Sequence, residues 1–129
     1  MRASIFTMNN LNINIQKRTK QFATRAIKAY AEINQKNHFN DAAVVLSKQF
    51  LRSSTSIGAN CAEAVYAQSN KDFLSKYSIA LKEASETRYW IELIIENKLA
   101  PQAKFKHMLD DLEVIIKILV SITKKLKEK

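Results

Sequence analysis

Residues that form tight turns are almost absent from this chain, since Gly58 is the one glycine and Pro101 the one proline among 129 residues. An antiparallel sheet needs tight reversals, and glycine and proline supply most of the backbone conformations that such reversals require. A chain of this length normally folds around one core. The sequence therefore predicts a single domain, residues 1–129, that is built from long helices.

Four runs of apolar residues recur at three- and four-residue steps, which is the spacing of one helix face. They predict helices over residues 12–35, 40–68, 70–98 and 102–127, with Asn or Asp at the start of the second and Ser69 or Asn70 capping the third. Residues 1–10 carry no such pattern, and residues 124–129 are expected to fray. The expected core positions are Ile15, Phe22, Ala26, Ala29, Tyr30, Ile33, Leu46, Phe50, Ile57, Cys61, Ala64, Phe73, Tyr77, Ala80, Ala84, Ile91, Ile94, Phe105, Leu109, Leu112, Ile116, Leu119, Ile122 and Leu126.

The connections between these runs are short, and short connections make consecutive helices antiparallel neighbours. The expected fold class is all-α, with an up-down-up-down antiparallel four-helix bundle. The chain has one cysteine, so no intrachain disulfide can form. Residues 3–6 are too short an apolar stretch for a signal peptide, and the most apolar run, residues 114–122, falls short of the roughly 20 residues of a membrane span. We expect a soluble, cytoplasmic protein with no membrane partner.

The formal net charge of +9 favours a polyanionic partner. Nucleic acid is the first candidate, although an acidic protein surface or anionic lipid would satisfy the same charge. The first predicted helix is the most basic, with five cations against Glu32, and a second basic group ends the chain. The basic positions are Lys17, Arg18, Lys20, Arg25, Lys28, Lys124, Lys125 and Lys127.

Residues 52–60 (RSSTSIGAN) are poor helix formers inside a predicted helix, because Ser and Thr compete for backbone hydrogen bonds and glycine costs about 1 kcal/mol relative to alanine. Small side chains allow a neighbouring helix to approach closely. One interpretation is tight packing at Ser53, Ser56, Gly58 and Ala59. The alternative is a narrow groove for a partner.

Two polar stripes follow from helical spacing. Arg52, Ser56, Asn60 and Glu63 share one side of the second predicted helix, and Ile79, Glu83, Glu86 and Trp90 share one side of the third. They predict a network between an arginine and two glutamates. Buried networks of this kind usually fix packing or register, and a direct role in binding or chemistry is the alternative.

Catalytic patterns are weak in this sequence. The Glu-x-x-His pairs of di-iron bundles are absent, since neither His38 nor His107 has a glutamate three positions earlier. Cys61 lies on an apolar stripe with no basic neighbour along its helix to activate it, and one glycine cannot form a phosphate-binding loop. We therefore expect no catalytic residue, no metal and no cofactor. An enzyme that uses Glu83 and Glu86 is the least favoured hypothesis.

Three segments together resemble one known family: residues 49–64 (QFLRSSTSIGANCAEA), 71–73 (KDF) and 79–90 (IALKEASETRYW). They are similar to the four-helix-bundle proteins encoded by intervening sequences of 23S ribosomal RNA genes, and the resemblance covers about residues 22–119. It implies a bacterial protein that assembles into a ring-like homo-oligomer, a pentamer. The related accessory variability proteins of diversity-generating retroelements assemble in the same way and bind a reverse transcriptase and nucleic acid.

The family motif maps onto two sets of residues in this sequence, with Cys61 at a position that is usually aliphatic. We expect the motif in the interior and in subunit contacts, and RNA contacts at the basic positions named above. The main hypothesis is an oligomeric protein that binds RNA or DNA, and the alternative is a scaffold that docks an acidic partner protein. A membrane-surface role for the first helix competes with the core for Phe22 and Ile33. The motif residues are Arg52, Ser53, Ser56, Asn60, Glu63, Glu83, Glu86, Tyr89 and Trp90.

Overall fold

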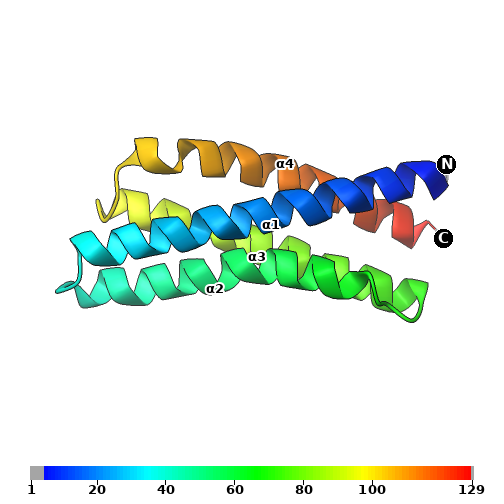
Figure 1. The fold of residues 1–129 in the computed structure, drawn as a ribbon, viewed down its shortest axis with the longest axis horizontal. Coiled ribbons are helices and arrows are strands. Elements are labelled where there is room, and N and C mark those ends of the chain that lie inside the picture. The colour runs from blue at the N-terminus through cyan, green and yellow to red at the C-terminus, as the bar shows by residue number, and fades with distance from the viewer. Residues whose placement is uncertain (1–4, 129) are drawn as a thin grey trace.

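Four helices make up the protein, whose computed structural model describes residues 5–128. They are α1 (Ile5–Lys36), α2 (Asp41–Ala64), α3 (Asn70–Glu96) and α4 (Gln102–Lys127). All four run along the long axis of the molecule, and the described residues contain no strand (Figure 1). The all-α fold class predicted from the sequence is confirmed.

Each helix packs against two neighbours. α1 contacts α2 and α4, and α3 contacts α2 and α4, whereas within residues 5–128 the diagonal pairs make no backbone contact. Because the connections are short, consecutive helices are antiparallel. The start of α1 and the end of α4 therefore meet at the same end of the bundle, where both chain termini lie (Figure 1). This arrangement brings the two basic segments of the sequence to adjacent helices.

Helix starts follow the expected capping chemistry. The side chain of Asn40 accepts a hydrogen bond from the backbone N–H of Ala43 (3.1 Å), and Ser69 accepts one from the N–H of Asp72 (3.0 Å). Each bond satisfies a donor that has no partner within its helix. Ser69, not Asn70, is thus the cap of α3.

Three helix ends differ from the sequence prediction. α2 ends at Ala64, four residues early, where the chain turns through Val65. α3 ends at Glu96, and Lys98 then adopts a left-handed backbone conformation (φ 57°). Two hydrogen bonds of 3.0 Å close the helix: the N–H of Lys98 donates to the carbonyl of Ile95, and the N–H of Leu99 donates to the carbonyl of Ile94. Glycine usually fills this position, so the sequence signal for the helix end was missing.

The third difference is the start of α1, whereas α4 begins and ends at the predicted residues 102 and 127. α1 begins at Ile5, seven residues before the predicted start, because no glycine or proline interrupts residues 5–11. The expected fraying of the C-terminal segment is wrong within the described residues. α4 stays helical to Lys127, and Leu126 is only 6% exposed, so burial of its side chain holds the last turn in place.

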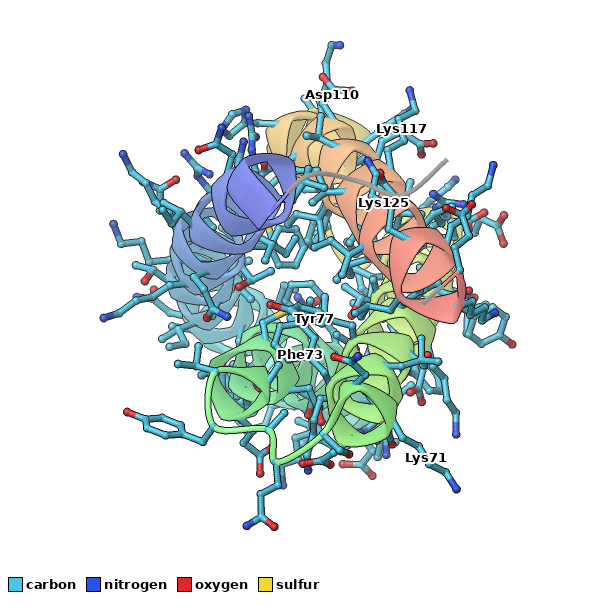
Figure 2. All side chains as sticks on the ribbon, turned by 90° about the vertical axis from the view of Figure 1, so that its right-hand side faces the viewer. Lys71, Phe73, Tyr77, Asp110, Lys117 and Lys125 are labelled. Carbon is cyan, nitrogen blue, oxygen red and sulfur yellow. The ribbon has the colours of Figure 1, made fainter. Side chains whose placement is uncertain are left out.

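The core is aromatic at its centre. Phe22, Phe50, Tyr77 and Phe105 are fully buried, and Figure 2 shows Tyr77 pointing between the helices. The rings of Phe50 and Phe105 meet edge to face with centroids 5.7 Å apart, which joins the diagonally opposed α2 and α4. Most expected core positions are buried, but five are only half-buried: Tyr30, Leu46, Phe73, Leu109 and Ile116. Spacing of apolar residues missed six buried hydroxyl side chains: Thr19, Ser47, Ser53, Ser54, Thr87 and Thr123.

Candidate nucleic-acid interface

Charge is divided unequally between the two sides of the bundle. α1 carries six basic residues and one acidic residue, and α4 carries six basic and three acidic. α2 carries two of each, and α3 carries four basic and five acidic. Because α1 is adjacent to α4 and α2 is adjacent to α3, nearly all the excess positive charge lies on one side. We call this side the α1–α4 face.

The outer side of α1 presents three exposed lysines. Lys17, Lys20 and Lys28 lie on the face opposite the core, and no carboxylate in the described part of the chain forms an ion pair with any of them. The exposed side chains of Ile13 (69%) and Ile27 (54%) lie on the same side. This surface suits a polyanion, because its three lysines can contact phosphates without first breaking an ion pair within the described chain.

Two other predicted contact residues are directed elsewhere. Arg18 and Arg25 both turn toward α4, where each forms an ion pair with Asp111 (N···O distances of 3.2 and 3.6 Å). The side chain of Asp111 is only 10% exposed, and Arg18 also donates to the side-chain oxygen of Asn14 (2.7 Å). One carboxylate thus holds two guanidinium groups at the α1–α4 seam.

The second half of α4 continues the basic surface. Lys117, Lys124 and Lys127 are exposed, and the Nζ of Lys125 lies 3.4 Å from the hydroxyl of Ser121. Lys117 projects away from the core (Figure 2). The acidic residues of α4 all precede residue 114 and each has a cation at ion-pair distance: Asp110 has Lys106, Asp111 has the two arginines, and Glu113 has Arg88. Residues 114–127 therefore contribute only positive charge.

Amide side chains accompany the cations near the start of α1. Asn10, Asn14 and Gln21 line an open hollow together with Ile13, Lys17 and Arg18. Amide and cationic side chains are the usual partners of phosphate and sugar oxygens in protein–nucleic acid complexes. The count of charges in the sequence indicates the cations of this surface but not the amides. The amides join the cations only because helical spacing places residues 10, 14, 17 and 21 on one side of α1.

The predicted arginine–glutamate network exists on the opposite side of the bundle. Arg52 of α2 donates to Glu83 (3.2 Å) and Glu86 (2.8 Å) of α3. The hydrogen bond to Glu86 is the largest of the effects that raise the pKa of Arg52. The network is not buried as expected, since the Arg52 side chain is 48% exposed. It lies in the outer seam between α2 and α3, where solvent screens it.

Except for Ser53, which is buried, the remaining motif residues also line this seam and do not fill the interior. Ser56 donates to the Arg52 carbonyl (2.7 Å) and Asn60 to the Ser56 carbonyl (2.8 Å), so both bond within their own helix. Glu63 pairs with Lys76 of α3 at 3.8 Å. Trp90 is half-buried beside exposed Tyr89, and its Nε1 has no hydrogen-bond partner. The expectation of an interior position is therefore wrong for these residues, whereas their expected role in subunit contacts remains a prediction.

Close packing explains part of the run of small residues. A side chain at Gly58 would begin 3.3 Å from the backbone oxygen and the hydroxyl of Thr19, so α1 and α2 approach closely there. Ser53 is buried and accepts a hydrogen bond from Thr87 of α3 (2.8 Å). Ser56 is only half-buried and Ala59 is exposed, so tight packing is confirmed at Ser53 and Gly58 alone.

Cys61 is a buried thiol, as its place on the apolar stripe predicts. Burial raises the pKa of Cys61 to about 12, and a hydrogen bond from Thr19 offsets this only in part. Burial, followed by the nearby Cys61, raises the pKa of Tyr77 to about 12 as well. A nucleophilic cysteine needs a lowered pKa, so Cys61 is unsuited to catalysis at neutral pH.

These pKa values predict that stability falls at high pH. The folded protein keeps both protons up to about pH 12, whereas the unfolded chain loses them near its ordinary values of 9.0 and 10.0. The unfolded state thus binds fewer protons between these limits, and the free energy of unfolding decreases as the pH rises from about 9 to about 12. Urea titrations across this range measure the effect. A Cys61→Ala variant should show a shallower decline, and an equal decline would contradict the assignment to Cys61.

Residues 5–128 contain no group of three or more His, Cys, Asp or Glu side chains placed to hold a metal ion. His38, whose ring lies 4.0 Å from that of Phe39 at a tilt of 48°, is exposed, as is His107. None of the helices within the same residues is long and apolar enough to span a membrane.

Comparison with known proteins identifies the family. The model of the 23S rRNA-intervening sequence proteins matches residues 12–121. The chain belongs to this family. One solved structure is similar as well: a crystal structure from Bacteroides thetaiotaomicron, of a protein of unknown function from the S23 ribosomal protein family, superposes with a TM-score of 0.81. The two chains are 40% identical over 88% of this chain and 98% of the other. Curated proteins give no match.

Family membership accounts for the fold and leaves the activity open. The matched region begins at residue 12 and ends at residue 121, so it contains the α2–α3 motif and the outer lysines of α1. It excludes Lys124, Lys125 and Lys127 at the end of α4. The lysines of α1 on the basic α1–α4 face therefore lie inside the matched region, and the last three lysines of α4 lie outside it.

Proposed function

We propose that this 23S rRNA-intervening sequence protein is an oligomeric, non-enzymatic protein of the cytoplasm that binds RNA or another structured nucleic acid. The observation that carries the proposal is the division of charge, with the excess cations on α1 and the second half of α4. Within residues 5–128 the exposed lysines of these two segments have no acidic partner, whereas Arg18, Arg25 and the carboxylates of α4 do. A polyanion would gain attraction there without displacing an internal ion pair.

Phosphate contacts explain how such a face would bind. Each lysine that neutralises a phosphate releases a condensed counterion, which makes affinity fall with salt. If Lys17, Lys20, Lys28, Lys124 and Lys127 each contact one phosphate, the logarithm of the binding constant should fall against the logarithm of salt with a slope of roughly −4 to −5 per subunit. The contacts are independent of sequence, so they position the nucleic acid and do not select it.

Self-association belongs to the same proposal and is supported by the α2–α3 side. Its charges are nearly balanced, and it exposes Val45, Ile79 and Tyr89 beside the Arg52 network. Balanced charge with exposed apolar and aromatic groups suits a protein contact. The resemblance found in the sequence implies a ring of five subunits, as in the related accessory variability proteins of retroelements, and we propose the same assembly for this protein. A ring would repeat the basic face and multiply weak contacts.

The test is the binding of purified protein to a structured ribosomal RNA fragment, followed by fluorescence anisotropy across a salt series, with light scattering for the subunit number. Salt-sensitive binding with the slope given above is the expected result, and a monomer would contradict the oligomer. Absence of binding at low salt would contradict the nucleic-acid function. A protein that then co-purifies after nuclease treatment would favour the scaffold that docks an acidic partner.

A further inference from the structure

The two basic segments of this face, residues 10–31 of α1 and 114–127 of α4, have no aromatic ring at a described exposed position. Between residues 10 and 31 the exposed positions of α1 carry lysine, amide, threonine and aliphatic side chains, and residues 114–127 of α4 contain no aromatic residue. The exposed aromatic side chains of the described chain lie elsewhere, with Phe39 and Tyr66 in the turns on either side of α2 and Tyr89 on α3. The described basic segments therefore carry positive charge but no exposed aromatic side chain on which an unpaired base could stack.

Single-stranded nucleic acid is a poor match for such a surface. Proteins that bind single strands combine a basic groove with aromatic side chains, and each stacked base contributes about 1–3 kcal/mol. Here the lysines project from the outer side of a helix, and no exposed aromatic ring accompanies them in the described residues 10–31 and 114–127. A double helix keeps its bases stacked on each other and presents phosphates outward, so it needs no ring from the protein.

The lysine spacing also fits two backbones. Lys17 and Lys20 lie one turn apart near the start of the outer face, and Lys28 lies eight residues beyond Lys20. At about 1.5 Å per residue, Lys28 is roughly 12 Å from Lys20 and 16 Å from Lys17 along the helix axis. The major groove of B-form DNA is about 12 Å wide. The segment between the two sets has no charged residue on its outer side, where Thr24 and Ile27 are exposed.

The arginines of α1 among the described residues are engaged in ion pairs, so they are not free to contact base edges. The commonest specific contact to a base is a two-pronged arginine on guanine. Arg18 and Arg25, the two arginines of α1 among the described residues, are both held by Asp111. Between residues 10 and 31 the exposed cations of α1 are lysines, which contact phosphates as point charges, and the other exposed polar groups are amides and Thr24.

We propose that the α1–α4 face takes double-stranded nucleic acid, with α1 lying across one groove so that Lys17 and Lys20 contact one strand and Lys28 contacts the other. The contacts are to phosphates, so the sequence of the duplex matters little. This inference rests on the proposed nucleic-acid function and narrows it to one class of ligand. RNA and DNA duplexes share the chemistry, and the experiment below separates them.

The test compares three fluorescent probes of equal length at the same salt concentration: an RNA duplex, a DNA duplex and an unstructured single strand, each of 24 base pairs or nucleotides. We expect at least one duplex to bind about tenfold more tightly than the single strand, and a scrambled duplex to bind within about threefold of the first. The tighter duplex identifies the ligand. A single strand that binds equally well or better overturns this inference alone. Failure of all three probes to bind overturns the proposed function and this inference with it.

A second measurement tests whether Lys28 contacts the second strand of the duplex. Lys28→Gln should weaken duplex binding and reduce the magnitude of the salt slope by about one, because one phosphate contact is lost. Lys71→Gln is the matched control, since Lys71 is exposed on α3 and projects from the other side of the bundle (Figure 2). An unchanged slope in Lys28→Gln, or an equal reduction in both variants, contradicts the placement of Lys28 on the second strand.

Discussion

Replacing Lys17, Lys20 and Lys28 together by glutamate is expected to weaken nucleic-acid binding by about a hundredfold or more at moderate salt. Each replacement removes one attraction to phosphate and adds one repulsion, and exposed charge interactions are worth up to about 1 kcal/mol each. Six such changes of roughly 0.5 kcal/mol amount to about two orders of magnitude. Fluorescence anisotropy with a duplex probe at several salt concentrations measures the loss.

The control for this variant has the same net charge in another place. Lys48, Lys71 and Lys82 are exposed on α2 and α3 and form no ion pair within the described chain. Reversing all three also removes six units of charge, and binding should change by less than about fivefold, because these positions lie outside the α1–α4 face. Equal losses in the two triple variants would mean that affinity follows total charge, and the assignment to α1 would be wrong. Circular dichroism checks that both variants remain folded.

The sequence predicts the helices of this protein well because their signals are local. Apolar residues at helical spacing depend only on the chain itself, and so do the caps at Asn40 and Ser69. The ends of α2 and α3 were less predictable, since Lys98 takes the left-handed position without the glycine that usually marks it. Local signals thus give the elements, and their last turns depend on contacts with other helices.

The candidate site shows what local signals cannot give. Periodicity placed Lys17, Arg18 and Arg25 together as basic residues of one helix, but it could not show that Asp111, more than 80 residues away, holds both arginines. The contact of Arg52 with Glu83 and Glu86 was predicted because opposite charges on neighbouring helices attract. Its exposure was not predicted, because the rotation of a helix about its own axis depends on the packing of all four helices.

Buried hydroxyl groups are a second kind of nonlocal feature. Thr19 reads as polar in the sequence, yet it lies between the core and Gly58 of α2. Thr87 and Ser53 bond to each other across α2 and α3, so neither loses a hydrogen bond on burial. A pattern that counts apolar residues alone will miss such positions, although small residues at Ser53 and Gly58 did indicate close approach of the helices.

Truncation of Phe50 to alanine is expected to have the largest effect on stability, lowering the free energy of unfolding by about 3–5 kcal/mol. The ring is fully buried at the centre of the bundle, and its edge-to-face contact with Phe105 joins two helices that make no backbone contact. The loss includes the transfer of the ring, the cavity that remains and roughly 1 kcal/mol for the aromatic pair. For a domain that is stable by about 5–15 kcal/mol, this is a large share.

Urea and thermal denaturation followed by circular dichroism measure this loss, and the Tm should fall by roughly 10–20 °C. Val120→Ala is the matched control, because Val120 lies on α4, the helix of Phe105, and is 47% exposed, and its effect should stay within about 0.5 kcal/mol. A loss below about 1 kcal/mol in Phe50→Ala would mean that α2 and α4 do not meet through these rings. In that case α4, which carries half of the proposed interface, would need another anchor to keep its lysines beside those of α1.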